Sequence, residues 1–274
     1  MKIAAVQLTS RDDWRENLAV IESSVNKAVA AGAKLVVLPE NAMMFAGAKM
    51  RSLAESSDQE FLLQRFSTLA KEYAIHLVVG SHPSLFHADG TKVGKGRVRQ
   101  SCLVYGPEGE LKARYDKIHL FDVTVADQNG QYLESKVIEP GELEPVVIDL
   151  GELKLGLSIC YDVRFPEMYR KLADLGADLV VVPAAFTYRT GEVHWHTLLK
   201  CRAIENQFYV LGVNQCGQHT STRETYGNSA CYSPWGDCLG QLAHEPDILV
   251  IDVDLDKNKV CRQAMPVHQH RRFS

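Results

Sequence analysis

An eight-residue segment occurs twice in this chain. Residues 32–39 read Gly-Ala-Lys-Leu-Val-Val-Leu-Pro, and residues 176–183 read Gly-Ala-Asp-Leu-Val-Val-Val-Pro, with six identities in eight positions. Glycine is the usual residue just after a helix, and a short run of valine and leucine that stops at proline is typical of a buried strand. Each segment therefore predicts a helix followed by a buried strand. The recurrence predicts a fold built from two similar halves.

Strands and helices alternate along the rest of the chain. The predicted helices cover residues 14–30, 59–73, 166–175 and 193–207. The predicted strands cover residues 3–8, 35–38, 77–80, 101–105, 111–115, 146–150, 154–159, 179–182 and 209–213, and hairpin strands pass through Ala230, Leu239 and Val250. This pattern predicts an α/β fold with mixed sheets, and the duplicated unit favours two sheets packed face to face between helix layers. Because no linker-like segment divides the chain, we predict a single domain over residues 1–274.

Charge and composition exclude several classes of partner. The formal net charge is −4, so the chain lacks the basic excess that marks proteins which bind nucleic acids or anionic membranes. No apolar run approaches the ~20 residues that span a bilayer, and the apolar stretch at the N-terminus is too short for a signal-peptide core. The seven cysteines are scattered without a C-x-x-C pair, which indicates free thiols. We predict a cytoplasmic protein that binds neither nucleic acid nor membrane.

Three reactive side chains each follow a predicted strand. Glu40 follows the strand at residues 35–38, Lys117 follows the strand that ends at residue 115, and Cys160 follows the strand at residues 154–159. In open α/β sheets, functional sites form beyond the carboxyl ends of the strands. We therefore expect the three side chains to meet, although they are far apart in the sequence.

These three side chains supply what the hydrolysis of an amide requires. A cysteine thiol, with an ordinary pKa of ~8.5, needs a base such as Glu40 to become a nucleophile, and a partly buried carboxylic acid can protonate the departing amine. The Lys117 ammonium and the backbone N–H of Tyr161 would stabilise the oxyanion, typically by ~3–4 kcal/mol per donor. Taken singly, each residue also has an ordinary structural interpretation: a solvated turn carboxylate, a surface lysine and a core thiol.

The surroundings of these residues form three motifs. Residues 35–40 read Leu-Val-Val-Leu-Pro-Glu, residues 115–121 read Tyr-Asp-Lys-Ile-His-Leu-Phe, and residues 160–167 read Cys-Tyr-Asp-Val-Arg-Phe-Pro-Glu. The chain thereby resembles the nitrilase superfamily, the carbon–nitrogen hydrolases, which carry a strand-P-E, a Y-x-K-x-H-L-F and a C-Y-D-x-R-F-P-E motif in this order. The resemblance runs along the whole chain, and the joint occurrence of the three motifs is highly specific.

The resemblance implies a fold and a set of catalytic residues. It implies a four-layer αββα sandwich of two mixed sheets with pseudo-twofold halves. It also implies that Glu40, Lys117 and Cys160 form the catalytic triad, without a metal or an organic cofactor, and that Glu134 is a second carboxylate that positions Lys117 and the substrate. Members of the family commonly form dimers through helices near the nucleophile, so a homo-oligomer, at least a dimer, is expected.

One segment resembles a particular branch of the family. Residues 183–191 read Pro-Ala-Ala-Phe-Thr-Tyr-Arg-Thr-Gly and are followed by His194 and Trp195, as in the deaminated glutathione amidases. Members of that branch hydrolyse the amide of glutathione whose glutamyl amine has become a ketone, and they release 2-oxoglutarate and cysteinylglycine. The resemblance implies a small-molecule amide substrate, with Phe186 and Thr190 lining its pocket.

Arg164 is a candidate for binding the carboxylate at the 2-oxo acid end of such a substrate, through a bidentate contact. From the residues alone it could instead pair with Asp162 or Glu167. Two related activities stay open: an ω-amidase acting on 2-oxoglutaramate or 2-oxosuccinamate, and an N-carbamoyl amide hydrolase. A protein that retains the fold but acts only through interactions is a third alternative, against which the intact candidate triad argues.

Overall fold

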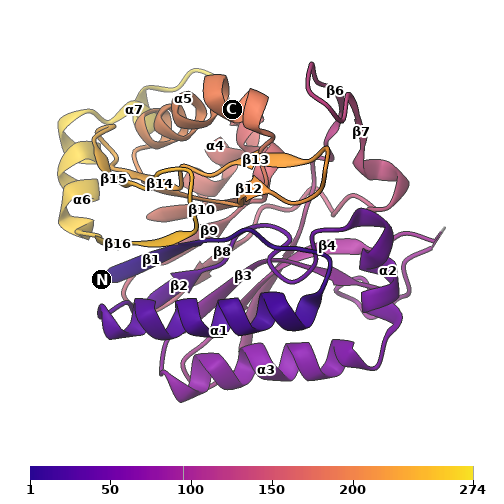
Figure 1. The fold of residues 1–274 in the computed structure, drawn as a ribbon. Helices are drawn as coiled ribbons and strands as arrows, with labels where there is room; N and C mark the ends of the chain where they lie inside the picture. The colour runs from indigo at the N-terminus through magenta and orange to yellow at the C-terminus, as the bar shows by residue number, and fades with distance from the viewer. Residues whose placement is uncertain (95, 274) are drawn as a thin grey trace.

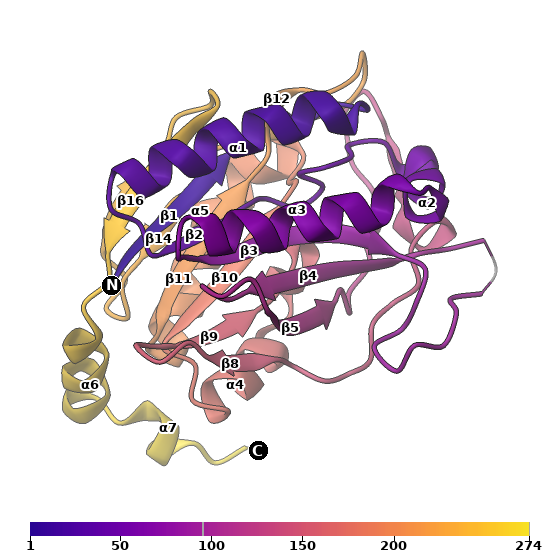
Figure 2. The same cartoon turned by 90° about the horizontal axis from the view of Figure 1, so that it is seen from below.

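Two six-stranded sheets face each other between layers of helices (Figures 1 and 2). The computed structural model describes residues 1–94 and 96–273. The first sheet has the strand order β16 (Asp247–Asp252), β1 (Lys2–Gln7), β2 (Leu35–Val37), β3 (His76–Ser84), β4 (Arg99–Tyr105) and β5 (Leu111–Asp116). The second sheet has the order β15 (Cys238–Gln241), β14 (Ala230–Tyr232), β11 (Tyr209–Asn214), β10 (Leu179–Ala184), β9 (Lys154–Leu157) and β8 (Val147–Asp149).

Helices cover the outer face of each sheet. The longer helices are α1 (Trp14–Ala30), α2 (Gly47–Glu55), α3 (Asp58–Glu72), α4 (Pro166–Asp174), α5 (Tyr188–Asn206) and α6 (Leu255–Ala264), and a short α7 (Val267–His270) follows. Figure 1 shows α1 and α3 beside the first sheet, with α4 and α5 beside the second. Two small hairpins, β6–β7 (Asp122–Thr124, Gln131–Leu133) and β12–β13 (Cys216–Gln218, Glu224–Tyr226), stand outside the sheets. Within the described residues, no helix is both long enough and apolar enough to cross a membrane.

The duplicated segment takes equivalent places in the two sheets. Gly32 follows α1 and Gly176 follows α4, and both have a positive φ, of 90° and 87°, which glycine adopts without steric cost. The Gly32 N–H donates a hydrogen bond to the Val29 carbonyl, and the Gly176 N–H donates one to the Ala173 carbonyl, so each glycine ends its helix in the same way. The strands that follow, β2 and β10, each lie between two parallel neighbours. The predicted four-layer sandwich with similar halves is therefore confirmed.

Alternation along β1 shows how one strand joins two layers of core. Ile3 and Ala5 are buried in the cluster that fills the space between the sheets, whereas Ala4 and Val6 are buried in the cluster beneath α1 and α3. Successive side chains of a strand point to opposite faces, so a strand that is covered on both faces needs a continuous apolar run. The sequence contains valine- and leucine-rich runs because these strands are buried on both faces.

Some predicted elements differ in the structure. The strand through Val250, β16, was expected to continue the C-terminal hairpins, but it pairs antiparallel with β1 in the first sheet. The helix predicted from residue 193 begins at Tyr188, because the Thr187 side chain caps it by accepting a hydrogen bond from the Thr190 N–H. The residues of this first turn lack an apolar period, so the pattern did not reveal it.

A buried histidine predicts that the fold is sensitive to acid. His82 of β3 is 1% exposed; its Nε2 lies 2.9 Å from Oε1 of Gln59, and its Nδ1 has no partner among the described residues. Burial lowers the pKa of His82 to about 4. Because the unfolded chain takes up this proton near pH 6.5, stability present above that pH is lost as the pH falls towards 4. We expect the unfolding free energy to fall by roughly 3 kcal/mol over this window.

Denaturant unfolding at several pH values measures this effect. The variant His82→Gln should have a shallower dependence of the unfolding free energy on pH, while His270→Gln, at an exposed position, should keep the dependence of the parent chain. Equal slopes for all three proteins would contradict the assignment to His82.

Candidate active site

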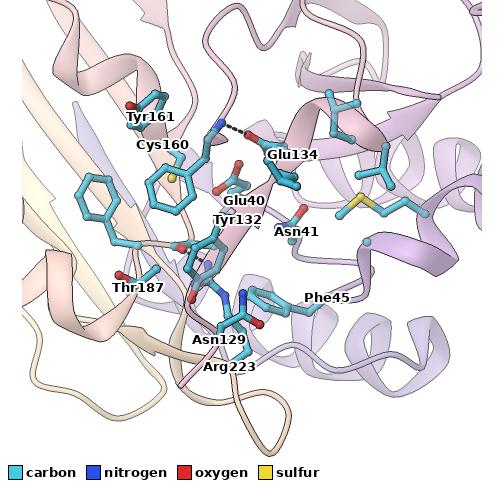
Figure 3. A pocket seen from close by; sticks show the side chains of 18 of the residues that line it. Glu40, Asn41, Phe45, Asn129, Tyr132, Glu134, Cys160, Tyr161, Thr187 and Arg223 are labelled. Atoms are coloured by element: carbon cyan, nitrogen blue, oxygen red, sulfur yellow. Dashed lines mark hydrogen bonds between the residues drawn. The ribbon is translucent and has the colours of Figure 1, made fainter. Parts of the chain in front are cut away.

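A buried cluster of one ammonium and two carboxylates lies at one edge of the sheets. The Lys117 Nζ lies 2.7 Å from Oε1 of Glu40, and 2.8 and 3.0 Å from the two carboxylate oxygens of Glu134. Glu40 and Lys117 are 2% and 1% exposed, and Cys160, 7% exposed, lies beside them (Figure 3). The structure thus brings together the residues that sequence reasoning placed at separate strand ends.

The strand directions explain why these side chains meet. β4 is antiparallel to both β3 and β5, so β5 runs in the same direction as β2, and their carboxyl ends lie at the same edge. Glu40 follows β2, and Lys117 follows β5 directly. Cys160 begins the short 3₁₀ helix η2 (Cys160–Arg164) after β9, and Glu134 begins another, η1 (Glu134–Lys136), after β7.

The backbone at Cys160 is strained. Its φ is 48°, in the left-handed region, which costs a residue other than glycine roughly 1–2 kcal/mol. Such strain is found where a side chain must be presented in a fixed direction. Two neighbouring contacts hold the turn: the Ile159 N–H donates to Oδ2 of Asp162 at 2.8 Å, and the Asp162 N–H donates to the Ile159 carbonyl at 3.1 Å.

Asp162 links the turn that begins at Cys160 to the segment around Lys117. Its fully buried carboxylate accepts a hydrogen bond from the Tyr115 hydroxyl at 2.7 Å and from the His119 backbone N–H at 3.1 Å, and the His119 Nδ1 lies 2.7 Å from Oδ1. Tyr115 and His119 stand two positions before and after Lys117. One carboxylate therefore fixes both flanks of the lysine relative to Cys160. The sequence suggested Asp162 only as a partner for Arg164. The tyrosine and histidine that flank the lysine were the signal that could have revealed this linking role.

The charges of the cluster determine its protonation. Burial alone would lower the pKa of Lys117, but the negative charges of Glu134 and Glu40 outweigh it and raise this pKa well above its ordinary value. Burial, and then the negative charge of Glu40, raise the pKa of the Cys160 thiol well above its ordinary value, while Lys117 and the backbone N–H of Ala185 oppose the shift. Burial likewise raises the pKa of Glu134. Lys117 is therefore an ammonium, and the resting thiol keeps its proton.

A cavity of about 400 Å³ opens over the cluster. Its floor contains Glu40, Lys117, Glu134 and Cys160. Its walls include Tyr161, Phe186 and Thr190, which the sequence indicated, and also Asn41, Phe45, Phe121, Asn129, Tyr132 and Arg223, which it did not. Among the residues that the structure describes, no group of three or more His, Cys, Asp or Glu side chains is arranged to hold a metal ion.

A family model described as "Carbon-nitrogen hydrolase" matches residues 2–263. The chain belongs to the carbon–nitrogen hydrolases. The match spans both sheets and all the residues of the cluster, so the family predicted from the three motifs is confirmed.

Known proteins resemble this hydrolase over nearly its whole length. A Yersinia enterocolitica protein named deaminated glutathione amidase is 40% identical over 272 residues, which cover 99% of this chain and 93% of the relative. The crystal structure of the C. elegans NitFhit protein matches 99% of this chain with a TM-score of 0.89 and 33% identity, and the match covers 65% of that longer chain. An amidase from Nesterenkonia sp. AN1, solved as a glutamate-to-glutamine variant with acrylamide added to its active-site cysteine, has a TM-score of 0.79 and 30% identity, over 98% of this chain and 99% of that one.

Arg164 of this hydrolase does not line the cavity in the present structure. Its two terminal nitrogens lie 3.3 Å from Nδ1 of His194, and its guanidinium stands over the rings of Tyr161 and Phe186. It forms no ion pair with Asp162 or Glu167 within the described part of the chain. Neither of the two carboxylate partners that the sequence left open for Arg164 is therefore found among the described residues.

Proposed function

We propose that this hydrolase is an amidase that cleaves deaminated glutathione into 2-oxoglutarate and cysteinylglycine, with Cys160 as its nucleophile. The observation that carries the proposal is the buried Glu40–Lys117–Glu134 cluster beside a cysteine on a strained turn. The substrate class is supported by the Yersinia relative, which bears the name of this activity at 40% identity. The amidase solved with an adduct on its cysteine supports a sulfur nucleophile.

The first half of the reaction forms a thioester. Because the thiol keeps its proton at rest, a base must remove this proton while the sulfur attacks, and Glu40 is the carboxylate that interacts with the thiol. The sulfur bonds to the amide carbon, and the carbonyl electrons move to oxygen. When the oxyanion collapses, the C–N bond breaks, and Glu40 returns the proton to the departing amine. Cysteinylglycine leaves, and the 2-oxoglutaryl group remains on Cys160.

The second half hydrolyses the thioester. Glu40, again a carboxylate, takes a proton from water as the water oxygen bonds to the acyl carbon. Collapse of this second oxyanion breaks the C–S bond, and the proton on Glu40 returns to the sulfur. The products are 2-oxoglutarate and the free thiol, so the enzyme regains its starting state.

Lys117 and the backbone N–H of Tyr161 are the proposed donors to both oxyanions. Lys117 stays charged because Glu134 and Glu40 raise its pKa, and the two carboxylates also fix the position of its Nζ. Glu134 is itself held by the Phe121 N–H, which donates to its Oε2 at 2.7 Å. We therefore assign Glu134 the role of positioning the ammonium.

The acyl part of the substrate is proposed to lie against Phe186 and Thr190, which line the cavity near Cys160. Arg164 stays a candidate for the 2-oxo acid carboxylate, provided that its guanidinium turns from His194 towards the cavity. Its position over the Phe186 ring keeps it adjacent to this wall.

A comparison of two substrates tests the proposed function. We expect kcat/KM for deaminated glutathione to exceed that for 2-oxoglutaramate by at least about tenfold. The reason is that only deaminated glutathione has a leaving group large enough to contact the cavity walls. Release of 2-oxoglutarate measures both reactions. Faster hydrolysis of 2-oxoglutaramate would favour the ω-amidase alternative, and no hydrolysis of either would favour a different amide.

We also propose that the protein acts in the cytoplasm, as a single domain and as a homo-oligomer of at least two chains. All seven cysteines are free thiols, which supports a reducing compartment. Val193 and Ile204 of α5 and the nearby Trp235 are exposed large apolar side chains, which supports a subunit contact on this side. Light scattering of the purified protein measures the oligomeric state directly.

A further inference from the structure

Arg223 presents a guanidinium to the cavity from an element that the proposed reaction does not use. It lies at the end of the β12–β13 hairpin, where its backbone N–H donates to Oγ1 of Thr220 at 3.1 Å and its carbonyl accepts from the His219 N–H at 2.9 Å. Figure 3 shows Arg223 with Asn129 and Phe45 at one side of the cavity, apart from Cys160. The tight turn of the hairpin thus fixes the base of this side chain.

The guanidinium of Arg223 lacks a charged partner among the described residues. Within residues 1–94 and 96–273, no aspartate or glutamate forms an ion pair with Arg223; its Nη2 donates to the Ala185 carbonyl at 2.7 Å, and its Nη1 is buried without a partner. The group stands over the rings of Phe45 and Tyr132, at 5.7 and 4.8 Å from their centroids. An arginine that stands over aromatic rings and keeps N–H donors that are not hydrogen-bonded is suited to bind a planar anion from the cavity.

The substrate of the proposed function carries a carboxylate at each end. One belongs to the 2-oxo acid, which becomes the acyl group on Cys160, and the other belongs to the glycine of the leaving group. Extended, the two residues of cysteinylglycine span about 7 Å, so the glycine carboxylate lies well away from the sulfur during the attack. A second cationic group at a distance from Cys160 matches this second carboxylate.

We propose that Arg223 binds the terminal carboxylate of the leaving group and so selects peptide-like amides over simple primary amides. The inference rests on the proposed function, since it assigns a subsite within the same cavity. A primary amide such as 2-oxoglutaramate releases ammonia and has no group that reaches Arg223. The subsite therefore contributes only to substrates with a carboxylate on the nitrogen side of the scissile bond.

A pair of matched substrates tests this subsite. The first is deaminated glutathione, and the second is the same molecule with its glycine carboxylate converted to a primary amide. For the parent enzyme we expect kcat/KM to be about 100-fold higher for the acid than for the amide, because the charge-assisted, bidentate contact is lost with the carboxylate. In Arg223→Ala this ratio should fall to near one, and in Arg223→Lys, which keeps the charge but not the fork, to an intermediate value. Arg15→Ala, at an exposed position on α1, should leave the ratio at 100.

The outcomes separate this inference from the proposed function. If the parent enzyme hydrolyses deaminated glutathione but Arg223→Ala keeps the 100-fold ratio, or loses activity equally on both substrates, the subsite is wrong and the proposed function stands. If the parent enzyme hydrolyses 2-oxoglutaramate but not deaminated glutathione, both are wrong. Calorimetric binding of the two substrates to Cys160→Ala, with and without Arg223→Ala, repeats the comparison without turnover. Equal affinities for acid and amide in Cys160→Ala would also overturn the subsite.

Discussion

Cys160→Ser and Cys160→Ala should each lower amide hydrolysis by at least about 10⁴-fold and leave the fold intact. The sulfur forms the covalent bond in both halves of the proposed reaction, and loss of the nucleophile in a comparable catalytic set removes nearly all rate enhancement. Serine keeps the size of the side chain, but its hydroxyl is a far weaker nucleophile next to a single carboxylate base. The measurements are kcat with deaminated glutathione and the unfolding midpoint of each variant.

A second cysteine and a trapped intermediate sharpen this test. Cys201→Ala, at an exposed position on α5, should retain the activity of the parent enzyme. Mass spectrometry of an acid-quenched reaction should find a 2-oxoglutaryl group on Cys160 and on no other thiol. Retained turnover in Cys160→Ala would contradict the assignment of the nucleophile.

Glu40→Gln should lower kcat by at least about 10³-fold and also lower the apparent pKa for alkylation of Cys160. The loss of rate follows because the proposed mechanism uses this carboxylate to move a proton in both half-reactions. The change in pKa follows because the negative charge of Glu40 is one of the causes that raise the pKa of the thiol, and glutamine removes that charge. Burial, the larger cause, remains, so the apparent pKa should stay above that of a free cysteine.

The pH dependence of the iodoacetamide reaction measures the second effect. As the pH rises, the thiolate fraction of Glu40→Gln should increase at a lower pH than that of the parent enzyme. Glu40→Gln should therefore be slower than the parent in turnover but faster in alkylation. Glu16→Gln, on the exposed face of α1, serves as the control and should change neither. A variant that lost turnover but kept the parent alkylation profile would show that Glu40 and the thiol do not interact.

Much of the fold could be predicted from local patterns. The repeat at residues 32–39 and 176–183 predicted two helix-to-strand units, and the structure places them at equivalent positions in two sheets. The glycine that ends each helix and the apolar run that follows depend only on neighbours in the chain. For this reason helix α1, whose apolar period is regular, was predicted with the bounds that the structure has.

The partner of a strand could not be predicted in the same way. Residues 247–252 form an apolar run between two aspartates, which indicates a strand but is compatible with either sheet. The structure pairs it with β1, at the edge of the first sheet, so the C-terminal part of the chain closes the N-terminal half. Strand pairing depends on which edge is free after the rest of the chain has folded, and no local pattern carries that information.

The sequence by itself determined the family: the motifs around Glu40, Lys117 and Cys160 predicted a carbon–nitrogen hydrolase, and the match of the family model to residues 2–263 confirms it. Only the tertiary structure decided what surrounds them. It linked Tyr115 and His119, on either side of Lys117, to the turn at Cys160 through Asp162, and within the described part of the chain it left Arg223 without a charged partner at the cavity wall. The physical reason is that a motif is a short-range property of the chain, whereas burial, charge pairing and the walls of a cavity arise where segments far apart in sequence pack together.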